Sequence, residues 1–162
     1  MWGQVLKLST RDVEALQTLG VIEDLLGNHQ QANALLREAV KLQPNSSQAL
    51  NNLALNYLKL NQPAEAISHL ERAVKVEPKN ANLNFNLGSL YFDQGMFLQA
   101  IAPLERARSI STADAAIEYK LVATFLQIQD VAKATEMWKR SDALRGASDP
   151  HVIISLAELF SK

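Results

Sequence analysis

The chain has no cysteine among its 162 residues, so it can form neither a disulfide framework nor a metal site built from thiolates. It is also poor in aromatic residues, at 6%, and carries only six glycines and five prolines, a composition that favours helix over sheet. An excess of charge is missing as well, because 16 basic side chains balance 17 acidic ones. This near-neutral charge gives no general attraction to phosphate backbones or anionic lipid, so we expect no nucleic acid and no membrane surface as partner.

Long apolar runs are also missing. No stretch is long enough to span a bilayer, and the first residues lack the basic stretch, apolar core and cleavage site of an export signal. We expect any export signal or anchor to lie outside this chain, so cytoplasm and periplasm both remain open.

The chain does contain a repeat with a period of 34 residues. Three sets of residues recur at this spacing: Leu19, Leu53, Leu87 and Leu121; Ala32, Ala66, Ala100 and Ala134; and Leu36, Leu70, Leu104 and Trp138. Two further sets recur in the same register: Gly20, Ala54, Gly88 and Val122; and Leu42, Val76, Ile110 and Leu144. Such self-similarity indicates stacked helical units rather than one compact domain.

Each period contains two helix-patterned segments separated by breaks. The break in the middle of each period holds Gly27, Asn61, Gly95 and Gln129, and Gly or Asn there suits a left-handed helix end. The second break falls at Pro44 and Pro78, since the residue before a proline resists helical geometry. Counting positions from residues 13, 47, 81 and 115, we expect small residues at positions 8 and 20 to let the two helices approach closely. Large aliphatic residues at positions 7, 24 and 30 would fill the space beside that contact.

This pattern resembles the tetratricopeptide repeat family. The best match is the second period, which has Leu50, Leu53-Ala54, Tyr57, Ala66, Leu70, Ala73 and Pro78 at the family's offsets. The resemblance implies an all-α fold, a right-handed superhelical α-solenoid of helix-turn-helix repeats. It predicts a single array with repeats at 13–46, 47–80, 81–114 and 115–149. The end of a preceding second helix would occupy 1–12, and a final first helix would occupy 150–162.

Several residues depart from the family pattern. Asn84 and Glu118 replace a large residue at position 4, and Glu23 replaces a tyrosine in the first repeat. Pro103 falls well inside the third repeat's second helix, where it removes a backbone hydrogen bond, so we predict a bend unless that helix starts late.

The resemblance also places a partner-binding groove along the first helices. Its predicted residues are Gln17, Asn51, Asn52, Phe85, Asn86, Ser89, Phe92, Tyr119 and Lys120, with Ala123 beside them. An Asn side chain offers a donor and an acceptor together, so it can hold the backbone of an extended peptide. Phe85, Phe92 and Tyr119 would add rigid apolar anchors. The alternative interpretation is structural: the asparagines bridge neighbouring helices, and the aromatic residues pack between them.

Other chemistry is weakly supported. The family's clamp for a C-terminal carboxylate needs Lys at position 5 and Asn at position 9, but the first repeat has Gln17 and Val21 and the second has Asn51 and Leu55. An acidic tail is therefore not the expected ligand. His29, His69 and His151 have no metal-ligand spacing, and we expect them to be surface residues. We expect no catalytic residue, no metal and no cofactor.

Three functional hypotheses remain. The first is a non-catalytic scaffold that binds a peptide or protein segment in the groove. The second is an architectural module that homo-oligomerises through exposed terminal helices. The third is the targeting arm of a larger enzyme whose catalytic domain lies outside this chain.

Overall fold

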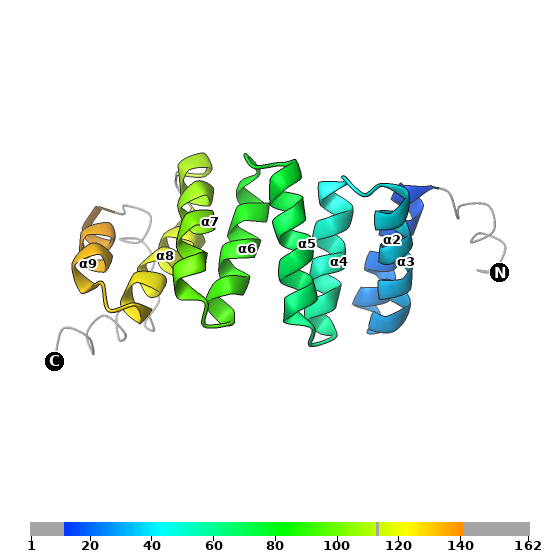
Figure 1. Cartoon of the computed structure of the whole chain (residues 1–162), viewed down its shortest axis with the longest axis horizontal. Coiled ribbons are helices and arrows are strands. Elements are labelled where there is room, and N and C mark those ends of the chain that lie inside the picture. The colour runs from blue at the N-terminus through cyan, green and yellow to red at the C-terminus, as the bar shows by residue number, and fades with distance from the viewer. Residues whose placement is uncertain (1–11, 113, 141–162) are drawn as a thin grey trace. The chain divides into compact units, whose positions relative to one another are not determined.

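The computed structural model describes residues 12–112 and 114–140, and within these ranges all regular structure is α-helical. The helices are α2 (Val13–Leu25), α3 (His29–Leu42), α4 (Ser47–Lys59), α5 (Pro63–Val76), α6 (Ala81–Asp93), α7 (Phe97–Ile110), α8 (Ala115–Gln127) and α9 (Val131–Arg140) (Figure 1). Contacts divide the chain into two compact units, Met1–Pro78 and Lys79–Lys162. The fold is therefore all-α, as expected. The helices predicted within 1–11 and 141–162 lie outside the described residues.

Each first helix begins after a residue whose side chain caps it. Asp12 Oδ1 accepts from the Glu14 amide at 3.1 Å, and Ser46 Oγ accepts from the Ala49 amide at 3.2 Å. The caps of the other two first helices are Asn80 and Asp114, whose side chains accept from the amides of Leu83 and Ala116. These four caps are spaced at the same period as the core residues, so the repeat also specifies where helices start.

The turn inside each hairpin uses one residue with positive φ. These residues are Gly27 (φ 83°), Asn61 (57°), Gly95 (72°) and Gln129 (62°). The predicted left-handed ends are thus confirmed. Gln129 adopts this backbone conformation without the freedom of Gly or the tolerance of Asn.

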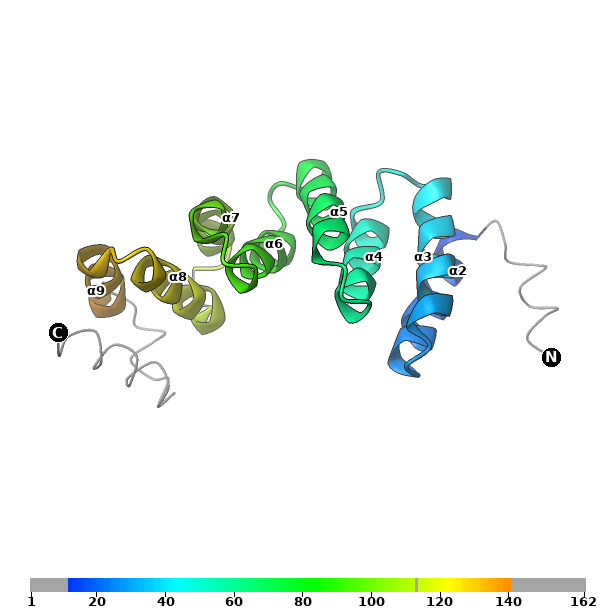
Figure 2. The same ribbon diagram turned by 60° about the horizontal axis from the view of Figure 1, so that its bottom comes forward.

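In the N-terminal unit, α2 pairs with α3 and α4 with α5, α3 packs on α4, and α2 also contacts α4 (Figures 1 and 2). Ala32 and Ala66 are fully buried, and Leu36 and Leu70 are 1% exposed. A Cβ atom on Gly20 would lie 2.7 Å from Leu36 Cγ. The close approach expected at positions 8 and 20, with a large residue at position 24 beside it, is confirmed in this unit.

In the C-terminal unit, α6 pairs with α7 and α8 with α9, α7 packs on α8, and α6 also contacts α8. Ala100 and Ala134 are fully buried. A Cβ atom on Gly88 would lie 2.5 Å from Leu104 Cγ. The hairpins of this unit therefore follow the same packing rule.

Polar residues replace the expected large residues at position 4 and are buried. Asn84 Oδ1 accepts from Arg106 Nε at 2.9 Å, and Asn84 Nδ2 donates to the Asn80 carbonyl at 2.8 Å. Glu118 is buried on α8. Burial raises the pKa of its carboxyl above the ordinary value, while the Arg108 guanidinium opposes that rise.

One expectation about packing is wrong, and a second concerns Pro103. The aliphatic residues at position 30 were expected to fill the core, but Leu42, Val76 and Ile110 are about 40% exposed. Each is the last residue of its helix, where the backbone leaves the interface. Helix α7 runs from Phe97 to Ile110 and includes Pro103. The helix therefore does not start late, and the bend at Pro103 stays a prediction.

Candidate functional site

A groove with a volume of about 950 Å³ opens on the first helices of the N-terminal unit. We call it the N-terminal groove. Gln17 and Val21 line it from α2, and Gln48 and Asn52 line it from α4. Because α2 and α4 contact each other, equivalent faces of two successive first helices form one surface.

Gln17 and Asn52, both predicted from the sequence, line this groove. The third predicted residue of this unit, Asn51, is half-buried and is not among the lining residues. Glu14 and Gln48 also line the groove, although the sequence prediction did not name them. Both stand at position 2 of their repeats, a position that the family pattern assigns to the groove.

Two buried side-chain oxygens among the described residues have no hydrogen-bond partner: Gln17 Oε1 and Ser89 Oγ. Buried polar atoms are paired in the great majority of cases, so an unpaired one calls for an explanation. Both residues belong to the predicted groove set. Gln17 is on α2 of the N-terminal unit, and Ser89 is on α6 of the C-terminal unit.

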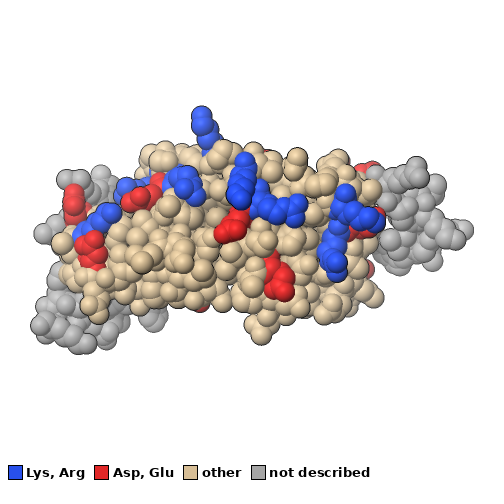
Figure 3. All heavy atoms as spheres, viewed as in Figure 1, with Lys and Arg blue, Asp and Glu red and all other residues tan. Residues whose placement is uncertain are grey.

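Charge is unevenly distributed in the N-terminal unit. On the face drawn in Figure 3, Lys and Arg side chains lie over α3 and α5. The only charged residues that line the N-terminal groove, among those the structure describes, are Asp12 and Glu14. The described lining of this groove therefore offers no basic side chain for a carboxylate.

The remaining predicted residues lie on α6 and α8 of the C-terminal unit. Lys120 Nζ lies 4.6 Å from the centre of the Phe92 ring and 3.2 Å from Asp93 Oδ1. Phe92 also meets Phe97 edge-on, with ring centres 5.4 Å apart. Phe92 and Lys120 are thus brought together, and the contact with Phe97 gives Phe92 part of the packing role considered as its alternative.

The other four residues of this set differ in their exposure to solvent. Tyr119 is 37% exposed on α8, while Phe85, Asn86 and Ser89 are half-buried on α6. Tyr119 is therefore the most accessible aromatic residue of the predicted set. Asn86 has a polar interaction within the chain.

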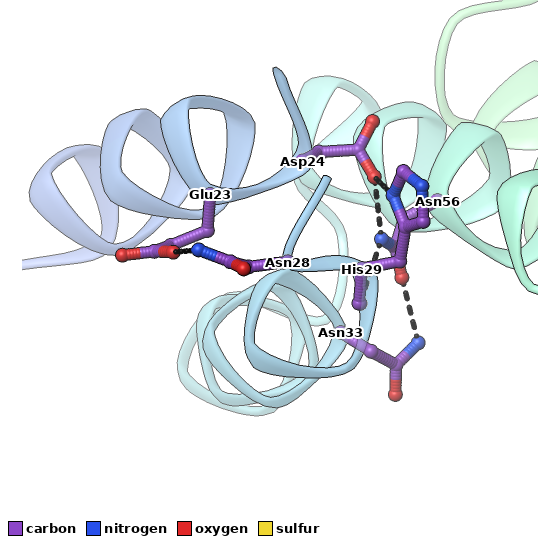
Figure 4. Close-up of polar contacts among 6 residues, drawn as sticks. All are labelled: Glu23, Asp24, Asn28, His29, Asn33 and Asn56. Atoms are coloured by element: carbon purple, nitrogen blue, oxygen red, sulfur yellow. Dashed lines mark hydrogen bonds and ion pairs between the residues drawn. The ribbon is translucent and has the colours of Figure 1, made fainter. Parts of the chain in front are cut away.

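A buried polar network joins the first two repeats, and the sequence did not predict it (Figure 4). Asn56 on α4 is 1% exposed. Its Nδ2 donates to Asp24 Oδ1 at 2.8 Å and to the His29 carbonyl at 3.0 Å, and its Oδ1 accepts from Asn33 Nδ2 at 3.0 Å. The sequence signal was a polar residue at position 10, where the first and third repeats have Ile22 and Leu90.

The histidines differ in their surroundings. The His29 side chain is 34% exposed, and its Nδ1 lies 2.8 Å from Asp24 Oδ1 in the same network. His69 Nδ1 lies 2.8 Å from the Glu65 carbonyl, and its ring packs on Tyr57 at 5.2 Å. His151 lies outside the described residues. Within the described part of the chain, no group of three or more His, Cys, Asp or Glu is placed to hold a metal ion.

None of the described helices is long and apolar enough to cross a membrane. The repeated hairpins and their first-helix groove define a helical-repeat protein of the α-solenoid class.

Comparison with known proteins identifies the family. A family model described as "Tetratricopeptide repeat" matches residues 51–116, and one described as "Anaphase-promoting complex, cyclosome, subunit 3" matches residues 1–73. A search of curated protein sequences found no match. The matches identify tetratricopeptide repeats in this chain. This fold generally mediates protein–protein interaction and is generally non-catalytic.

Solved structures share the fold. MamA superposes with a TM-score of 0.77 at 24% identity, over 85% of this chain and 75% of MamA. YrrB, a TPR protein with an unusual peptide-binding site, superposes with a TM-score of 0.83 at 15% identity, over 99% of this chain and 82% of YrrB. PilF of Pseudomonas aeruginosa superposes with a TM-score of 0.76 at 26% identity, over 93% of this chain and 69% of PilF.

Proposed function

We propose that the chain is a non-catalytic scaffold that binds an extended segment of a partner protein in the N-terminal groove. The observation that carries this proposal is the groove itself. It is formed by two successive first helices and lined by Gln17 and Asn52.

The lining suits recognition of a polypeptide backbone. Gln17, Gln48 and Asn52 each carry a carboxamide, which can donate to a peptide carbonyl and accept from a peptide amide. Val21 adds an apolar contact, being 39% exposed. The fold similarity to YrrB, whose peptide-binding site is its described feature, supports the same kind of ligand.

The C-terminal unit would extend this function through its own first helices. Asn86 stands one period after Asn52, and Phe92, Tyr119 and Lys120 would contribute aromatic and cationic contacts. We propose that these residues contact a further part of the same partner or a second partner.

Alanine variants test the proposal. Replacing Asn52 and Asn86 together should weaken binding of a captured peptide by about 1 kcal/mol for each lost hydrogen bond, with little loss of folding. Isothermal titration calorimetry measures the affinity, and circular dichroism measures the midpoint of thermal unfolding. A double variant that melts far earlier would show that the asparagines are structural and would contradict their assigned role.

Self-association is the second candidate, and one observation favours it. Leu25 and Leu26, at the end of α2, are 81% and 68% exposed. Corresponding residues of α6 are Asp93 and Gln94, which are polar. If two copies pair through these leucines, Leu25→Ser with Leu26→Ser should lower the weight-average mass measured by light scattering at high concentration. A wild-type chain that stays monomeric across the series argues against this candidate.

A further inference from the structure

The N-terminal groove continues beyond the turn between α3 and α4. A second hollow of about 530 Å³ shares Gln43, Ser46 and Gln48 with it and extends to Glu77 at the end of α5. We call the two hollows together the extended groove. All its described lining residues belong to the N-terminal unit.

The charged residues that line the extended groove, among those the structure describes, are acidic. Its charged lining residues, within the described chain, are Asp12, Glu14 and Glu77, and all three are acidic. The neutral lining between them consists mainly of carboxamides and hydroxyls. Among the described basic residues of the same unit, Arg37, Lys41, Lys59 and Lys75 line neither hollow. Arg72 on α5 lies at the edge of the extended groove, because its Nη2 donates to the Pro44 carbonyl at 3.1 Å, so the three carboxylates face one guanidinium.

Resting on the proposed function, we propose that the extended groove selects a polypeptide segment that carries Lys or Arg. Carboxylates stand on both sides of the turn that holds Gln43 and Ser46, so a segment crossing that turn meets acidic groups toward each end. The three carboxylates of the groove would repel an acidic segment. They would attract a basic segment and help to orient it.

The three carboxylates can be neutralised with little disturbance of the fold. Asp12→Asn keeps a side-chain oxygen at a helix N-cap, where Asn and Asp are equally suited. Glu77→Gln keeps an oxygen that can accept from Ser47 Oγ, its present donor. Glu14→Gln keeps the length of an exposed side chain.

A matched control changes the net charge by the same amount outside the groove. Glu38→Gln, Glu65→Gln and Glu71→Gln remove three carboxylates from α3 and α5 of the same unit. None of these three residues lines the extended groove.

The experiment selects binders from a phage-displayed library of random dodecapeptides on the full chain. We expect the selected peptides to be enriched in Lys and Arg over the unselected library, with binding weakened about thirtyfold in the Gln17→Ala and Asn52→Ala double variant. Neutralising the groove carboxylates should weaken these peptides by about two- to fivefold for each carboxylate contacted, as measured by fluorescence anisotropy. The control variant should bind them like the wild type, and added salt should reduce the difference.

Selected peptides that need Gln17 and Asn52 but show no basic enrichment would overturn this inference and leave the proposed function standing. Equal weakening by the groove and control variants would do the same, because it would show a general charge effect. If no selected peptide depends on Gln17 and Asn52, the proposed function itself fails, and this inference fails with it.

Discussion

Asn52 and Asn56 lie one helical turn apart on α4, yet their surroundings differ. Asn52 is half-buried and lines the N-terminal groove, whereas Asn56 is 1% exposed and makes three hydrogen bonds to the preceding repeat. The same residue type therefore has two different environments on one helix. Asn52 faces the groove that we propose as the binding site, while Asn56 fixes how two hairpins meet.

Asn56→Ala should lower the free energy of unfolding by about 2–3 kcal/mol, because it leaves buried partners such as the Asn33 amide without a bond and opens a cavity. Asn52→Ala is the control, with an expected loss within about 0.5 kcal/mol. Urea denaturation followed by circular dichroism measures both. Equal losses for the two variants would mean that the network adds no stability.

Glu118 has a consequence for pH dependence. Its pKa is raised above the ordinary value of 4.5 by burial, so the folded chain holds this proton more tightly than the unfolded chain. The contribution of Glu118 to stability is therefore greatest below the unfolded pKa. It falls as pH rises through the window between the unfolded and folded values.

Glu118→Gln keeps a neutral side chain of similar shape at every pH. The free energies of unfolding of variant and wild type should agree below the window, and the variant should be the more stable above it. Urea denaturation at a series of pH values measures the difference. A variant that is less stable than wild type at neutral pH would show that the ionised carboxylate, with Arg108, is stabilising.

Packing between the two helices of a hairpin depends on the residue at position 8. At Gly88, a Cβ atom would lie 2.5 Å from Leu104 Cγ and 3.2 Å from the Leu104 amide nitrogen, which belongs to the backbone of α7. At Gly20, the tight contacts are only with the side chain of Leu36, and the nearest backbone atom, the Ala32 carbonyl oxygen, is 3.5 Å away. The two glycines therefore differ in how easily their neighbours can move.

Gly88→Ala should destabilise the chain by about 1–2 kcal/mol, because overpacking against a backbone outweighs the gain in helix propensity. Gly20→Ala should cost less, since Leu36 can change its side-chain conformation. Thermal unfolding of both variants compares them. A Gly88→Ala variant at least as stable as the wild type would show that α6 and α7 separate without cost.

The helices could be predicted from the sequence because their signals are local and periodic. The alanines at position 20 and the left-handed residues at each turn follow directly from the 34-residue spacing. Position 30 was misjudged because periodicity does not reveal where a helix stops covering its neighbour. Leu42 is apolar and in phase, yet it is exposed at the end of α3.

The candidate site was only partly predictable. Gln17 and Asn52 were found because they stand at positions that the family pattern directs toward a groove. The Asn56 network was not found, because a side chain's partners 23 to 32 residues away depend on how successive hairpins meet. The acidic lining was missed for a related reason, since Glu77 reaches the extended groove from a different repeat than Asp12 and Glu14.

On the scale of the whole molecule, the chain comprises two compact units with separate sets of internal contacts. Stability in repeat proteins is approximately a sum of terms from each repeat and from contacts between neighbours. A substitution that destabilises one repeat therefore need not destabilise distant repeats. The Asn56 network joins α2, α3 and α4, which all lie in the N-terminal unit.

Asn56→Ala should therefore reduce amide protection mainly in α2, α3 and α4, while α6 and α7 keep protection close to that of the wild type. Hydrogen exchange followed by mass spectrometry on peptic fragments measures each segment. Gly88→Ala provides the converse variant, whose loss should concentrate in α6 and α7. If both variants reduce protection equally throughout, the chain unfolds as a single cooperative unit, and the division between Pro78 and Lys79 has no energetic counterpart.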